Sequence, residues 1–187
     1  MSHSSERPTP RFLLHTRTLE LKCFERSDGL FEVEGHLGDE KPFDLKLSDG
    51  TRRHAGTPIH DLWLRLTVNA EREIVAVEAS MPVPAHASCD GARSAYDNLV
   101  GVRIGPGWIQ EARERIADSS GCTHLSEMLQ QLGTTLLQGM YGHYHRRERP
   151  GKKLAPIKDG LLDSCFGLRR GGALDRMRRQ RPAPELD

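Results

Sequence analysis

The chain has 187 residues, enough for one large domain that can bury a core without needing a disulfide or a metal in order to fold. Its 27 lysines and arginines are balanced by 26 aspartates and glutamates, which argues against a nucleic-acid-binding protein. The hydrophobic fraction of 36% is low, and we attribute part of this to polar chain ends.

Neither a membrane span nor an export signal is visible along the sequence. No stretch approaches the roughly 18 to 20 apolar residues that a membrane span requires. Residues 1–10 are polar and lack the apolar core of a signal peptide. We therefore expect a cytoplasmic protein with no membrane contact, whose four cysteines are thiols rather than two disulfides.

Alternating apolar and polar residues predict β-strands in the first half of the chain. The pattern is found in residues 19–24, 31–34, 43–48, 62–68 and 74–79. A period of two places each apolar set on one face of a half-buried strand. The last two predicted strands are separated by a short polar segment, which is typical of an antiparallel hairpin.

After Pro84 the spacing of the apolar residues changes to the three and four of α-helices. We predict a helix that begins near Asp90 and ends at Gly101, a second over residues 106–116, and a third and longest over residues 121–140. Because the strands precede the helices instead of alternating with them, the sequence predicts an α+β fold. An antiparallel sheet in the N-terminal half would pack against the C-terminal helices.

Composition divides the chain into three parts. Residues 1–10 show no periodicity and are expected to be disordered, and residues 11–145 are expected to form a single α+β domain. Residues 146–187 are predicted to be a basic, partly disordered extension with a short helix around residues 161–166. Its arginine and lysine runs are typical of a solvated tail, with contact to an anion or to RNA as the minority interpretation.

Four residues with metal-binding side chains fall at the ends of predicted elements. They are His60, Cys89, Cys122 and His124. Thiolate and imidazole are the usual ligands of zinc and of iron–sulfur centres. Cys122 also opens a predicted helix, where the helix dipole favours the thiolate that a metal needs. Their spacing alone does not separate metal binding from a structural role.

Two further residues are candidates for proton transfer. Asp61 adjoins His60 and can serve as a base, as a metal ligand or as the group that orients the imidazole, or it can cap the strand. Tyr96 follows Cys89 in the predicted helix. It can donate a proton near that cysteine, or it can pack in the core with its hydroxyl at the rim.

The order of these segments carries a resemblance to a known fold. His60 precedes the strongest strand, Cys89 opens a helix that ends in Leu99-Val100-Gly101, and Gly121-Cys122-Thr123-His124 opens the longest helix. In this respect residues 56–132 resemble the iron–sulfur cluster assembly scaffold family (the IscU/NifU-like fold). The resemblance implies a metal site built from these residues. His60 stands where the family has its first cysteine and the last pair is reordered, so a tightly held zinc or iron ion fits better than a transient cluster.

A second resemblance covers more of the chain, about residues 12–140. It rests on the segments Arg26–Leu30, Leu37–Lys41, Ile59–Asp61 and Gly121–Leu125. Through these segments the chain resembles a bacterial family known only as a domain of unknown function. This resemblance brings no activity with it.

Four functions fit these residues. The first is a small metalloenzyme, a hydrolase or lyase acting on a small carbonyl compound, in which zinc or iron serves as a Lewis acid or activates water. The second is a metal or iron–sulfur cluster binding and delivery protein with a protein partner. The third is an enzyme with Cys122 as the nucleophile. The fourth is an interaction domain in which the cysteines and histidines only pack. The sequence leaves the oligomeric state open.

Overall fold

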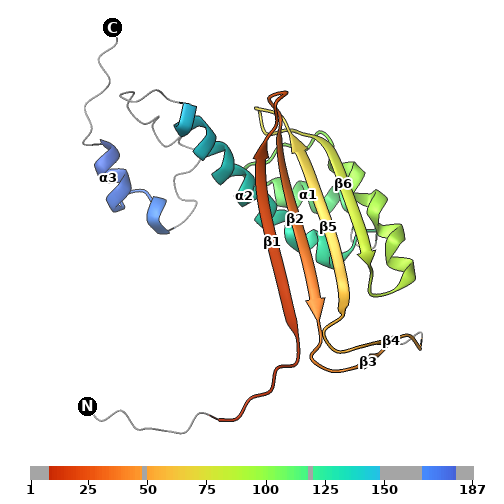
Figure 1. Ribbon diagram of the computed structural model, residues 1–187. Helices are drawn as coiled ribbons and strands as arrows, with labels where there is room; N and C mark the ends of the chain where they lie inside the picture. The colour runs from red at the N-terminus through yellow and green to blue at the C-terminus, as the bar shows by residue number, and fades with distance from the viewer. Residues whose placement is uncertain (1–8, 48–49, 118–119, 148–165, 180–187) are drawn as a thin grey trace, which may run out of the picture. The chain divides into compact units, whose positions relative to one another are not determined.

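A computed structural model describes residues 9–47, 50–117, 120–147 and 166–179 (Figure 1). The chain divides into two compact units, Met1–Gly139 and Met140–Asp187. The second unit contains the short helices η3 (Phe166–Leu168) and α3 (Ala173–Arg179). The chain ends expected to be disordered and the helix expected around residues 161–166 lie largely outside the described residues.

Four long strands of the first unit form one antiparallel sheet in the order β1-β2-β5-β6. The strands are β1 (Thr16–Glu25), β2 (Phe31–Glu40), β5 (Pro58–Val68) and β6 (Ile74–Val83). Four of the five predicted strands are therefore confirmed, each somewhat longer than its sequence pattern. The predicted α+β class with an antiparallel sheet in the N-terminal half is confirmed as well.

The fifth predicted strand, residues 43–48, does not join the sheet. Among its described residues, 43–47, only Leu45–Lys46 (β3) form a strand, which pairs with Arg52–Arg53 (β4) in a small separate hairpin. The carboxylate of Asp44 accepts a hydrogen bond from the backbone N–H of Ala55, 3.1 Å away, which folds the segment back on itself. A local hydrogen bond of this kind competes with sheet pairing.

Helices follow the strands in the chain and cover one face of the sheet (Figure 1). They are the 3-10 helix η1 (Ala87–Leu99) and the α-helices α1 (Trp108–Ile116) and α2 (Thr123–Arg147). The sequence predicted an α-helix from Asp90, but η1 begins earlier, where His86 Nδ1 accepts a hydrogen bond from the N–H of Ser88. Its Ser, Asp, Gly and Asn residues are weak α-helix formers, which accounts for the different helix type. No helix within the described ranges combines the length and hydrophobicity that a membrane span needs.

The two central strands have chemically different faces. Most helix-facing residues of β2 and β5 are apolar and buried: Phe31, Val33, Leu37, Leu62, Leu64, Leu66 and Val68. Helix α2 approaches so closely at Gly35 that a Cβ there would lie 3.3 Å from the side chains of Met128 and Leu132. On the opposite face Trp63 is 36% exposed. Neighbouring residues of one strand therefore lie in different environments, one against the helices and the next on the more exposed face.

Candidate metal centre

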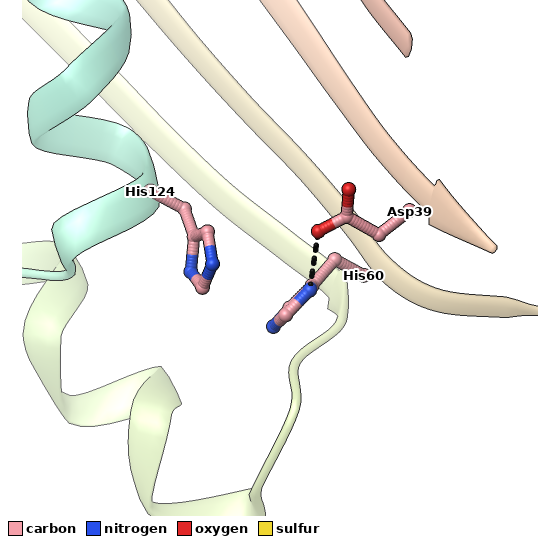
Figure 2. A group of neighbouring side chains, drawn as sticks. All are labelled: Asp39, His60 and His124. Atoms are coloured by element: carbon pink, nitrogen blue, oxygen red, sulfur yellow. Dashed lines mark hydrogen bonds and ion pairs between the residues drawn. The ribbon is translucent and has the colours of Figure 1, made fainter. Parts of the chain in front are cut away.

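Three side chains with metal-binding groups meet at one end of the sheet, where β2 ends and β5 begins (Figure 2). Asp39 of β2 is paired in register with His60 of β5. His124 is the second residue of α2. Asp39 continues the helix-facing side of β2, so both strand residues point towards α2. One potential ligand atom from each of the three residues lies within 4.8 Å of the others.

Asp39 is a buried carboxylate, with a side chain only 1% exposed. Arg17 of β1 donates two hydrogen bonds of 2.8 Å, from Nε to Oδ1 and from Nη2 to Oδ2. His15 Nε2 lies 3.1 Å from Oδ1. Burial disfavours the charged form, but the hydrogen bonds from Arg17 and His60 outweigh it and lower the pKa of Asp39 to about 2. Asp39 is therefore ionised at neutral pH.

His60 is oriented by this carboxylate. Its Nδ1 lies 2.8 Å from Asp39 Oδ2, as the dashed line in Figure 2 shows. Because a carboxylate only accepts hydrogen bonds, Nδ1 carries the proton and Nε2 presents a lone pair on the other side of the ring. Histidines that bind metals are commonly held in this way, with the second ring nitrogen bonded to a carboxylate.

His124 brings a second imidazole to the same place. The centroids of the His60 and His124 rings are 4.2 Å apart and the rings are tilted by 46°. Burial lowers the pKa of His124, and the neighbouring His60 and Arg17 lower it further. The neutral imidazole that results is the form that binds metal ions.

Cys122 lies beside His124 at the start of α2. Its Sγ is 3.8 Å from Nδ1 of His124. Zinc bonded to one sulfur and one nitrogen in tetrahedral geometry holds those two atoms roughly 3.6 Å apart. The observed separation therefore allows Cys122 and His124 to share one ion.

Tyr96 of η1 fixes the backbone at Cys122. The Tyr96 hydroxyl accepts a hydrogen bond from the Cys122 N–H at 3.1 Å and donates one to the Cys122 carbonyl at 2.7 Å. Ser126 Oγ lies 2.9 Å from the Tyr96 hydroxyl oxygen. Burial raises the pKa of Tyr96 to about 12. The geometry thus makes Tyr96 an anchor for the start of α2; that it transfers protons, as the sequence suggested, stays a prediction.

Residues 15–138 match the model of a family described as "Protein of unknown function (DUF2889)". The chain belongs to this family. The matched range contains all four strands of the sheet, together with Asp39, His60, Cys122 and His124. No curated protein and no solved structure matches the chain. The resemblance to a family of unknown function, predicted from the sequence, is confirmed.

Three of the predicted residues with metal-binding groups, Asp61, Cys89 and Cys122, lie outside the group of ligand atoms that converge within 4.8 Å. Cys122 contacts one member of that group, His124. Asp61 and His60 point to opposite faces of the sheet, because adjacent residues of a strand face opposite sides. There its Oδ1 bonds His36 Nε2 at 2.7 Å and Trp63 Nε1 at 3.1 Å. Cys89 is a half-buried thiol of η1 and is not among the described residues whose ligand atoms converge.

The sequence analysis missed Asp39 and Arg17 as members of the site. A signal for Asp39 was present: Phe31, Val33 and Leu37 mark one face of β2, and Asp39 continues the same alternation. A charged residue in the buried phase of a strand needs a partner. Arg17 is that partner, opposite Asp39 in the β1–β2 register.

Proposed function

We propose that the DUF2889 domain binds one zinc or iron ion through His60, His124 and Cys122, with Asp39 as the group that orients His60. The observation that carries the proposal is the pair of imidazoles with centroids 4.2 Å apart, one of them held by a buried carboxylate. The four contacts to the Asp39 oxygens occupy all the acceptor sites of that carboxylate, so we place it behind His60 and not on the ion.

This ligand set supports an enzymatic function. Three protein ligands leave a fourth position open for water or a substrate oxygen, as in catalytic zinc sites. An ion held there would polarise a carbonyl group or lower the pKa of bound water. We therefore propose a hydrolase or lyase that acts on a small carbonyl compound.

A hollow that reaches the residue before Cys122 supports a small polar substrate, and none of the three proposed ligands lines it. It has a volume of about 600 Å³ and lies between η1 and the segment that follows α1. Its lining includes Ser88, Ser94 and Ser120, and also Gly121, the residue before Cys122. Hydroxyl groups of this kind can bind the oxygens of a carbonyl compound.

Analysis of metal content tests the binding site directly. We expect about one zinc or iron ion per chain in the anaerobically purified wild type and a loss of metal in His60→Ala, His124→Ala and Cys122→Ala. His36→Ala is the matched control, because His36 lies on the opposite face of the sheet and pairs with Asp61. A wild type that stays free of metal after reconstitution, or metal retained in all three site variants, would contradict the proposal.

A thiol enzyme is the second candidate, favoured by the 3.8 Å separation between Cys122 Sγ and the neutral His124 imidazole. Alkylation separates the two candidates. A bound metal should protect Cys122 from iodoacetamide until a chelator is added, with Cys89 as the internal control. A nucleophilic Cys122 should react rapidly with or without the chelator.

The IscU/NifU-like core and a delivery function are a further proposal for the same residues. Cys122 and His124 are close together, as that resemblance implies. His60, however, is only 12% exposed and is bonded to Asp39. An enclosed, oriented ligand favours a retained ion over a cluster that is passed to a partner.

A further inference from the structure

The two edges of the sheet differ in their protection against pairing with another strand. The edge strand β6 contains Pro82, its pairing with β5 shifts register twice, and η1 packs against it. Prolines, bulges and covering elements are the usual means of blocking an edge. Edge strand β1 has ten residues, no proline and an unbroken register with β2. Its outer backbone groups can therefore pair with a further strand.

We propose that β1 pairs in antiparallel fashion with β1 of a second copy of this chain, joining the two four-stranded sheets into one. In the register we infer, the two Leu21 residues lie opposite each other across the two-fold axis. Glu20 of each copy then faces Lys22 of the other, Leu19 faces Cys23, and Thr18 faces Phe24. Residues that face each other in this register share one face of the joined sheet.

Charge complementarity on the exposed face selects this register. Glu20 and Lys22 are 54% and 51% exposed and lie 3.0 Å apart within one chain. The two-fold axis turns this neighbouring pair into two opposite-charge pairs between the copies. Opposite charges directly across two antiparallel strands are favourable, and like charges there are unfavourable. The strand is thus complementary to itself.

The helix-facing side of β1 is incompletely covered by the part of the first unit that the structure describes. Leu19, Leu21 and Cys23 are only half-buried, whereas the corresponding residues of β2 and β5 are fully buried. A groove of about 420 Å³ runs here between Leu21 and polar residues of α2. Leu19, Leu21 and Cys23 of a second copy would lie against the same apolar row and extend its burial.

The segment before β1 supports the same partner. Phe12, Leu13 and Leu14 are 86%, 64% and 66% exposed, an unusual run of large apolar side chains at a surface. In the proposed register this segment runs beside the turn between β1 and β2 of the second copy. Leu30 at the end of that turn offers it an apolar contact.

Charge reversal tests the register without touching the metal-binding residues. Light scattering coupled to size-exclusion chromatography should show a dimer for the wild type. Glu20→Lys or Lys22→Glu alone places like charges opposite each other at two positions and should weaken dimerisation on the order of tenfold or more. Circular dichroism should show that both variants keep the fold, and their metal content should match that of the wild type.

Two matched controls isolate the pairing itself. The double variant Glu20→Lys/Lys22→Glu restores opposite charges at every position and should dimerise like the wild type. A mixture of the Glu20→Lys and Lys22→Glu chains should form a heterodimer, since each supplies the charge that the other lacks. A monomeric wild type, or a dimer that neither single reversal weakens, would overturn the proposal.

Discussion

Asp39 links the stability of the fold to pH. Its pKa is about 2 in the folded protein, compared with about 3.9 in an unfolded chain. The unfolded state therefore takes up a proton first as the pH falls. The stabilisation is fully present above about pH 5 and is lost as the pH falls towards 2. This difference in pKa corresponds to about 2 to 3 kcal/mol of folding free energy.

Asp39→Asn should remove this dependence on pH. We expect the variant to lose about 2 to 3 kcal/mol at pH 7, because Arg17 and His60 keep their donors but lose the charge between them. Between pH 5 and pH 2.5 its stability should then change less than that of the wild type. Urea denaturation at a series of pH values measures both effects. Asp97→Asn, at an exposed position of η1, is the control that should keep the wild-type acid limb.

Tyr96→Phe tests whether the hydroxyl anchors the start of α2. Without it the N–H of Cys122 loses its partner and the Cys122 carbonyl keeps only the bond from the Ser126 N–H, which should cost about 1 to 3 kcal/mol. We also expect weaker metal binding, since Cys122 and His124 would no longer be held together. Ser126→Ala removes only one contact and should cost less. A Tyr96→Phe protein with unchanged stability and metal affinity would rule out the anchoring role.

At the scale of elements, α2 depends on glycine where it crosses α1. A Cβ at Gly133 would lie 2.6 Å from Cζ2 of the buried Trp108. Gly142 lies in the same helix with no atom within 4 Å of such a Cβ. Both alanine variants gain helix propensity, so their difference measures packing. We expect Gly133→Ala to be destabilised by about 1 to 3 kcal/mol and Gly142→Ala to be stabilised by up to about 1 kcal/mol in thermal melts.

The elements themselves could largely be predicted from the sequence. Period-two alternation identified β1, β2, β5 and β6 because each has one face against the helices. The segment 43–48 has the same alternation but bonds to itself through Asp44, which the pattern does not reveal. The spacing of apolar residues likewise located η1 without specifying its helix type.

The candidate site was only partly predicted, because two of its features depend on the faces and the register of the strands. His60, Cys122 and His124 could be found because each stands near the start of an element. Asp61 was grouped with His60 because the two are adjacent in sequence, although strand geometry places them on opposite faces. The contact between Arg17 and Asp39 depends on the β1–β2 register, which could not be read from this single sequence.

At the scale of the whole molecule, the proposed ion would join β5 to α2. Because His60 comes from the sheet and His124 from the helix that covers it, an ion bound to both stabilises the packed state over the unfolded chain. At a free metal concentration about 100 times the dissociation constant the gain is about 2.7 kcal/mol. Thermal melts with zinc, and again with a chelator, should show this as a rise in Tm that the chelator reverses.

The variants decide whether that shift belongs to the proposed site. The Tm of His60→Ala and that of His124→Ala should each be unchanged by zinc, whereas the Tm of His36→Ala should rise like that of the wild type. Glu20→Lys should also respond fully, because Glu20 is exposed in the middle of β1 and lacks any part in the ligand set. A response lost in Glu20→Lys as well would mean that the ion acts through association of the chains and not by joining β5 to α2.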